Sequence, residues 1–271
     1  MNGRIDVGRV VEEVFRIYRD QAGVLLPAAL VVFVVEGLIS GVLIAISFAL
    51  VLVALIVQIV ATTLYQGMVV QLVADVQDGR RDASVEVLLR SVQGAIVPLI
   101  LTGLLAGIGI AIGFVLLIVP GLFLLTIWSV AAPVVVLERP GVVAALGRSR
   151  ELVRGHGWQV FGVIVLFFLI LVVASAIIGG IGAAAGDVGR VIADIVTSVL
   201  VAPLIALAAS VLYFQLRAAK GETGVPGHAV GLETPQAAAP PAAPGEPTTP
   251  GQPPGPEAPP PQGEQPPPAQ P

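Results

Sequence analysis

Long stretches of the chain contain no charged side chain. Four of them lack Asp, Glu, Lys and Arg altogether, namely residues 37–74, 91–137, 157–186 and 195–216. A helix needs about 20 apolar residues to cross the hydrocarbon core of a bilayer. The two shorter stretches therefore predict one span each. Residues 91–137 suit two spans, and residues 21–74, whose single charge is Glu36, suit two more. The pattern predicts six transmembrane helices.

Amphipathic segments alternate with the pairs of spans. Residues 5–20, 84–93 and 141–155 each place an apolar stripe at helical spacing among charged side chains. In the first segment this stripe consists of Val7, Val11, Val14 and Tyr18. Such helices suit the headgroup plane of a membrane. Each segment runs into a span near a glycine, which would relieve a bend there: Gly23, Gly94 and Gly157. We therefore predict an all-α polytopic membrane helical bundle, with six transmembrane helices in three hairpins, each hairpin preceded by an amphipathic interfacial helix.

Glycine and proline divide the apolar stretches further. The outer turns of the three hairpins are expected near Ser47, at Pro120-Gly121 and at Gly179–Gly182. Two prolines lie deeper within their spans and are expected to kink them: Pro133 and Pro203. Two small-xxx-small patterns predict close helix packing: Gly103 with Gly107, and Gly109 with Gly113.

Composition separates the last part of the chain from the rest. The chain is 56% hydrophobic and 12% charged, against about 45–50% and about 25% in soluble domains. Residues 221–271, however, hold 17 of the 23 prolines. Such a segment cannot bury a core and favours extended polyproline II structure. We predict an integral membrane domain over residues 1–220 and a disordered, Pro-rich cytoplasmic tail over residues 221–271. The tail is either a solvated segment without a specific role or a ligand for an aromatic groove on another protein.

Basic side chains indicate the orientation of the spans. Cytoplasmic loops of membrane proteins are enriched in Lys and Arg. With six spans, Arg190 falls on one side and thirteen basic residues fall on the other: Arg4, Arg9, Arg16, Arg19, Arg80, Arg81, Arg90, Arg139, Arg148, Arg150, Arg154, Arg217 and Lys220. Both chain ends are therefore predicted to be cytoplasmic. Six of these arginines are candidates for contact with anionic phospholipid headgroups, namely Arg9, Arg16, Arg19, Arg148, Arg150 and Arg154.

One acid lies near the middle of the first span. An ionised carboxylate there costs at least about 2.5 kcal/mol. Glu36 must therefore be protonated, face a water-filled cavity, or be paired with another polar group. It is either a proton or cation site or a neutral acid hydrogen-bonded to another helix. Three polar residues of the second span could line a path beside it: Gln58, Thr62 and Gln66. Interhelical hydrogen bonding is the favoured alternative for these three.

The sequence shows no arrangement typical of catalysis or metal binding. The chain has no cysteine and two histidines, and no nucleophile, base or metal-ligand spacing is recognisable. We therefore expect no catalytic residue, no cofactor and no metal. The basic residues lie at headgroup height between spans, so nucleic-acid binding is not expected either.

Residues 116–165 carry the most distinctive motifs. They contain Val-Pro-Gly at 119–121, Trp-Ser at 128–129, Pro-Val-Val-Val-Leu-Glu at 133–138 and Ala-Leu-Gly-Arg-Ser-Arg-Glu-Leu-Val-Arg-Gly at 145–155. In these motifs the chain resembles the membrane domain named after prokaryotic glycerophosphoryl diester phosphodiesterases, over roughly residues 5–220. The resemblance implies a bacterial plasma membrane. That family's chemistry resides in a separate soluble barrel domain, whose His-Arg-Gly and paired Glu signatures have no match in this chain.

Three functions are compatible with these features. The first is a non-enzymatic membrane-embedded scaffold or lipid-interacting module, which the basic amphipathic helices and the resemblance favour. The second is a small transporter or lipid-moving protein that uses Glu36. The third, an intramembrane enzyme acting on lipid headgroups, is the least favoured. A packed core without a water-filled cavity would support the scaffold. A continuous water-filled path to Glu36 would support transport.

Overall fold

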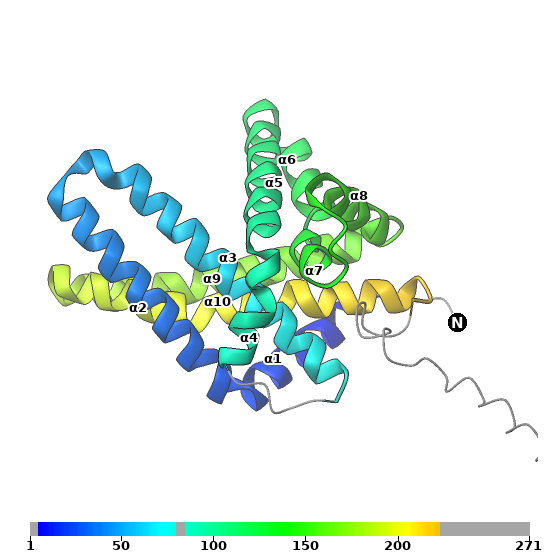
Figure 1. The fold of residues 1–271 in the computed structure, drawn as a ribbon, viewed down its shortest axis with the longest axis horizontal. Coiled ribbons are helices and arrows are strands. Elements are labelled where there is room, and N and C mark those ends of the chain that lie inside the picture. The colour runs from blue at the N-terminus through cyan, green and yellow to red at the C-terminus, as the bar shows by residue number, and fades with distance from the viewer. Residues whose placement is uncertain (1–4, 80–84, 223–271) are drawn as a thin grey trace, which may run out of the picture. The chain divides into compact units, whose positions relative to one another are not determined.

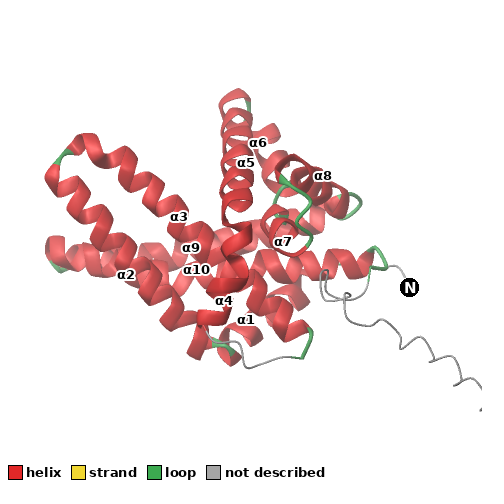
Figure 2. Ribbon diagram, in the orientation of Figure 1, coloured by secondary structure: helices red, strands yellow, loops and turns green. Residues whose placement is uncertain are grey.

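The computed structural model describes residues 5–79 and 85–222 (Figures 1 and 2). All regular secondary structure in these residues is helical, which confirms the predicted all-α fold. Six segments are long and apolar enough to cross a membrane, so the chain is a polytopic helical bundle: Ala22–Leu43, Val51–Gln77, Glu86–Leu116, Ile118–Leu137, Gly157–Ala184 and Val188–Ala219. The predicted tail lies outside the described residues from residue 223 onward.

Three antiparallel hairpins organise the described part of the chain. They consist of α2 and α3, of α5 with α6 and α7, and of α9 and α10 (Figure 1). The helices are α1 (Val7–Asp20), α2 (Ala22–Ile46), η1 (Phe48–Leu50), α3 (Val51–Gln77), α4 (Val85–Val92), η2 (Gln93–Ala95), α5 (Ile96–Leu116), α6 (Ile118–Ile127), α7 (Ala131–Leu137), α8 (Val142–Val153), α9 (Gly157–Ala184) and α10 (Gly186–Ala219).

The hairpin turns match the sequence prediction in one case out of three. The first turn is at Ser47, as predicted. The second is at the extended residue Leu117, and Pro120 and Gly121 lie in the first turn of α6. Proline is compatible with a helical first turn because the N–H groups there have no intrahelical partner. The third turn is at Ala185 and Gly186, where φ is 79° at Gly186. Gly179–Gly182 lie within α9, so this predicted turn was also wrong.

The three amphipathic helices lie where they were predicted, before each hairpin, as α1, α4 and α8. The three predicted glycines lie at the junctions between these helices and the spans. Gly23 is the second residue of α2, Gly157 is the first residue of α9, and Gly94 lies in η2 between α4 and α5, and none of them has a positive φ. The positive φ before α9 belongs instead to Gly155, at 92°.

The apolar face of α1 packs on the protein itself. Val10, Val14 and Ile17 are buried and contribute to the main core, and α1 contacts α2, α9 and α10. The helix begins at Asp6, whose Oδ1 accepts a hydrogen bond of 2.9 Å from the backbone N–H of Gly8. Of the predicted stripe, Val14 is buried, and Val7, Val11 and Tyr18 are partly buried and pack against the same core.

The fourth span is interrupted near its middle. α6 ends at Ile127, and α7 begins at Ala131 after a turn. Pro133 explains the break, because it has no N–H for the carbonyl of Ser129 and its ring crowds that carbonyl. The predicted effect of Pro133 is thus confirmed. α10, by contrast, continues through Pro203.

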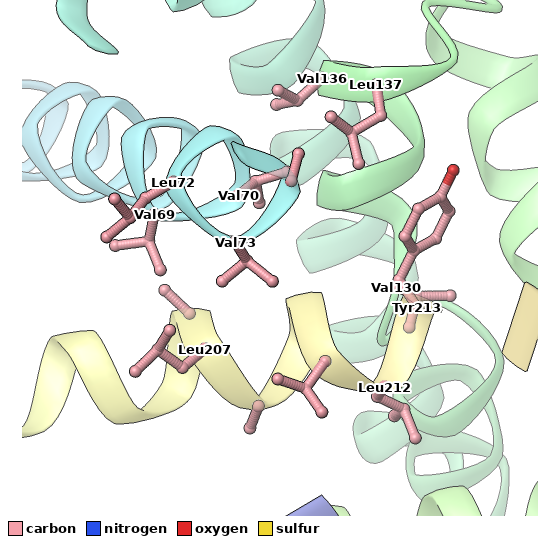
Figure 3. Close-up of a cluster of buried hydrophobic side chains, with 14 of the residues drawn as sticks. Val69, Val70, Leu72, Val73, Val130, Val136, Leu137, Leu207, Leu212 and Tyr213 are labelled. Atoms are coloured by element: carbon pink, nitrogen blue, oxygen red, sulfur yellow. The ribbon is translucent and has the colours of Figure 1, made fainter. Parts of the chain in front are cut away.

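The core lies toward the helix ends opposite the hairpin turns, which we call the base. Buried side chains of α3, α7 and α10 meet there, and Val73 of α3 points toward α10 (Figure 3). Apolar side chains of the spans near the hairpin turns are uncovered: Ile46, Val115 and Val188 are 69%, 87% and 73% exposed. In a membrane protein such surface is suited to contact with lipid. The protein's own packing therefore holds the base, and the spans are exposed toward their turns.

One of the two small-residue patterns on α5 is used in packing. A Cβ on Gly113 would lie 2.9 Å from Cα of Gly121, and a Cβ on Gly109 would lie 2.7 Å from the ring of Trp128. These glycines let α5 approach the fourth span closely, as predicted. Gly103 and Gly107 have nothing within 4 Å of a Cβ position, so this pair makes no such contact within the described chain.

Candidate functional site

A cluster of charged side chains lies at the base, at the exit of α10. We call it the basal cluster, and its five members come from α8, α10 and the residues after α7 and α10: Glu138, Arg148, Tyr213, Arg217 and Glu222. Their side chains are mostly withdrawn from solvent, with 22% exposure at Arg148, 17% at Glu138 and 12% at Arg217. Charged groups so little exposed require partners.

Hydrogen bonds join the members of the basal cluster pair by pair. Arg148 Nε donates to Glu138 Oε2 over 3.0 Å, and Arg148 Nη2 donates to Glu222 Oε2. Arg217 Nε donates to the same Glu222 oxygen over 3.1 Å. Tyr213 Oη donates to Glu138 Oε1 over 2.8 Å. Glu151 of α8 also lies 3.4 Å from Arg148 Nη1. Arg148 thus contacts three carboxylates, and its bonds to Glu138 and Glu222 connect α8 with the residues that follow α7 and α10.

Two turns bring these side chains together. Arg139 and Gly141 adopt φ values of 50° and 94° and reverse the chain between α7 and α8. At the end of α10, Gly221 has a φ of 78°. The N–H of Gly221 donates to the carbonyl of Ala218, and that of Glu222 donates to the carbonyl of Arg217. This is a Schellman motif, which needs glycine at the left-handed position, and it returns Glu222 toward the end of α10.

The electrostatics of the basal cluster favour the charged forms. Burial by itself would raise the pKa of Glu222, but hydrogen bonds from Arg148 and Arg217 outweigh it and hold this pKa below the ordinary value of 4.5. Burial would likewise lower the pKa of Arg148, and its bonds to Glu222 and Glu138 instead raise it. Glu222 and Arg148 are therefore both charged at neutral pH.

The lowered pKa of Glu222 predicts a pH-dependent contribution to stability. Its pairing stabilises the fold above about pH 4.5, the unfolded value, and this stabilisation is lost as the pH falls through the lower folded value. We expect the difference in thermal midpoint between the wild type and Glu222→Gln to shrink below pH 4.5. Thermal unfolding of both proteins in detergent across this pH range tests the expectation. A difference that persists in acid would contradict it.

A smaller polar contact joins α1 to the same end of the bundle. Glu13 accepts hydrogen bonds from Gln77 Nε2 over 3.0 Å and from Gln215 Nε2 over 3.5 Å. Arg16 lies 3.5 Å from the same carboxylate. Glu13 thereby connects α1 with the final turns of α3 and α10.

The polar residues predicted inside the membrane do not form one site. Glu36 is half-buried in α2, and its Oε1 accepts a hydrogen bond of 2.9 Å from Ser40 Oγ, one turn further on. Gln58 and Thr62 are exposed on α3, and Thr62 Oγ1 donates to the carbonyl of Gln58 over 2.7 Å. Gln66 is half-buried. Each of these two hydrogen bonds lies within a single helix, and a polar path between α2 and α3 stays a prediction.

Five of the six arginines predicted to meet headgroups lie at the surface, namely Arg9, Arg16, Arg19, Arg150 and Arg154. Lipid contact stays a prediction for them. Arg148 differs, because it lies inside the basal cluster and binds two carboxylates of the protein. The sequence did not identify Glu138, Tyr213 or Glu222 as site residues. Tertiary packing brings together Tyr213 and Glu138, which are 75 positions apart, and Arg148 and Glu222, which are 74 positions apart.

An apolar cavity of about 270 Å³ lies among α6, α9 and α10. Its walls include Leu125, Val163, Phe167 and Leu212, and Ser129 at the break in the fourth span is its polar member. The Oγ of Ser129 is buried without a hydrogen-bond partner. Within the described residues, no group of three or more His, Cys, Asp or Glu is placed to hold a metal ion.

These features define an integral, multi-pass α-helical membrane protein. No family model, no curated protein and no solved structure matches the chain. The resemblance to the membrane domain named after glycerophosphoryl diester phosphodiesterases therefore stays a prediction from the motifs of residues 116–165.

Proposed function

We propose that the protein is a non-enzymatic membrane-embedded scaffold with a lipid-interacting surface. One observation carries the proposal: polar side chains at the base join helices to one another, and the hairpin turns expose apolar side chains. Such a division suits a rigid base from which three hairpins enter the bilayer.

The surface arginines support contact with anionic phospholipid. Arg9, Arg16 and Arg19 are 72%, 60% and 84% exposed on α1, and α1 precedes the first span directly. Basic residues near a span are each worth about 1 kcal/mol at an anionic membrane surface. On this proposal the base faces the cytoplasm of a bacterial cell, both chain ends lie there, and the tail is available to a soluble partner.

Purification from native membranes in mild detergent tests the scaffold. Mass spectrometry of the proteins and lipids retained with the full chain is the readout, and an unrelated multi-pass protein purified in parallel is the control. A stoichiometric protein partner supports the scaffold. Absence of a partner, together with strong enrichment of one lipid class, would replace it by a lipid-moving function.

One observation favours transport as the second candidate. Glu36 is half-buried in the first span with a hydrogen bond of 2.9 Å from Ser40, and acids within spans often belong to ion or proton pathways. If the protein is a scaffold, Glu36→Gln will leave partner yield unchanged and stability within about 0.5 kcal/mol, because Gln has the same shape and accepts the same bond. Lipid scrambling and proton flux in liposomes measure the alternative. Activity in the wild type that is lost in Glu36→Gln, but kept in the control Glu12→Gln, which neutralises an exposed acid of α1 outside the spans, would establish transport.

A further inference from the structure

Two guanidinium groups from different helices meet at one carboxylate oxygen in the basal cluster. Arg148 Nη2 of α8 and Arg217 Nε of α10 both donate to Glu222 Oε2. The two arginine side chains are 22% and 12% exposed, against 33% for Glu222. Both arginines lie within helices, and Glu222 follows the end of α10, where its N–H donates to the carbonyl of Arg217. The acceptor side chain is the most accessible of the three.

This arrangement matches the recognition of phosphate. Guanidinium groups bind carboxylates and phosphates through the same directed, charge-assisted hydrogen bonds. Glu138 accepts from Arg148 Nε, and Glu151 lies 3.4 Å from Arg148 Nη1. The nitrogens that Glu222 occupies are Arg148 Nη2 and Arg217 Nε, and these are the donors that a second anion would take over. A phosphate carries more acceptor oxygens and more negative charge than the Glu222 carboxylate that occupies this position.

The two arginines also lie at positions along the chain where lipid headgroups are expected. Arg148 lies in the connection between the fourth span, which ends at Leu137, and the fifth, which begins at Gly157. Arg217 lies in the last turn of the sixth span. Span ends mark the border between hydrocarbon and headgroups, where the phosphates of phospholipids are found.

We propose that Arg148 and Arg217 form a phosphate-binding site, and that Glu222 occupies it as an internal competitor. The phosphate belongs to an anionic phospholipid headgroup or is free in solution. The inference deepens the lipid-interacting part of the proposed function and rests on it for the lipid source alone. A tethered carboxylate competes at a high effective concentration, so the site in the wild type is open for a fraction of the time. The apparent dissociation constant rises by the inverse of this fraction.

Removing the competitor is therefore expected to strengthen binding. Glu222→Ala should lower the apparent dissociation constant for inorganic phosphate about tenfold or more, measured by isothermal titration of the full chain in detergent at constant ionic strength. Glu12→Ala removes an exposed glutamate of α1 and is the control for net charge, so it should match the wild type. In the Glu222→Ala background, Arg217→Gln should abolish the gain. Arg217→Gln leaves the Arg148–Glu138 pair intact, and thermal unfolding verifies that each variant is folded.

The source of the phosphate is distinguished in nanodiscs. Discs of phosphatidylcholine alone, and discs that also contain phosphatidate, are compared by mass spectrometry of the lipids that remain bound after exchange into detergent. Phosphatidate retained by Glu222→Ala, but not by Glu222→Ala with Arg217→Gln, assigns the site to a lipid headgroup. Binding of inorganic phosphate alone assigns it to free phosphate. If Glu222→Ala binds neither ligand more tightly than the wild type, the site does not exist, whatever protein partner the scaffold test finds.

Discussion

Gly67→Leu is expected to destabilise the protein by about 3 kcal/mol. Gly67 is buried in α3 within the base, and a Cβ there would lie 2.5 Å from Cγ1 of Val92 and 3.4 Å from Cδ2 of Leu99. Val92 and Leu99 are themselves 0% and 3% exposed, so neither side chain has solvent-facing space into which it could move. A leucine must therefore separate α3 from α4 and α5. Unfolding in detergent, followed by circular dichroism, measures the loss.

Gly103→Leu is the matched control for this prediction. Gly103 lies in α5, also in a membrane span, but nothing approaches within 4 Å of its Cβ position. The same change of residue should leave stability unchanged or raise it slightly, because leucine favours a helix over glycine by up to about 1 kcal/mol. Equal destabilisation by both substitutions would show that the close contact at Gly67 is not the cause.

Arg148→Met is expected to lower the free energy of unfolding by about 2 kcal/mol. The substitution leaves Glu138, 17% exposed, with Tyr213 as its remaining hydrogen-bond donor among the members of the basal cluster. Breaking a fully buried ion pair costs about 3–5 kcal/mol, and partial exposure of both partners reduces this penalty. Chemical denaturation of the purified protein in detergent is the measurement.

Two further variants distinguish the contribution of the Arg148–Glu138 ion pair from that of the packing of the Arg148 side chain. Arg150→Met changes an exposed arginine in the same helix and should stay within about 0.5 kcal/mol of the wild type. Adding Glu138→Gln to Arg148→Met removes the unpaired charge and should recover part of the loss. Failure of the double variant to recover stability would indicate that the cost of Arg148→Met is lost packing.

The spans and amphipathic helices were predictable from sequence because lipid imposes a simple rule on long charge-free stretches. The turns were less predictable. Pro120 and Gly179–Gly182 look like breaks in a sequence, but proline is compatible with a helical first turn and glycine is common in membrane helices. The turns form instead at Leu117 and at Ala185-Gly186, where local sequence gives a weaker signal.

The basal cluster could not be predicted from the sequence, because tertiary packing brings its members together. Arg148 looks like a headgroup ligand because basic residues between spans usually meet lipid, and its local sequence does not reveal Glu138 and Glu222 as its partners. The role of the intramembrane polar residues stays a prediction. Gln58, Thr62 and Gln66 recur at four-residue spacing, but spacing does not determine which side of α3 the neighbouring helices cover.

The contacts of α10 impose an order on biosynthesis. This last helix packs against α1, α2 and α3, which are the first to leave the ribosome. Until α10 arrives, Val10 and Val14 of α1 lack most of the surface that covers them. Contacts between the first and last helices cannot form during elongation, so the nascent hairpins must wait in the bilayer in a partly assembled state. A chain truncated before α10 would present the same unfinished surface permanently, which makes it a substrate for membrane quality-control proteases.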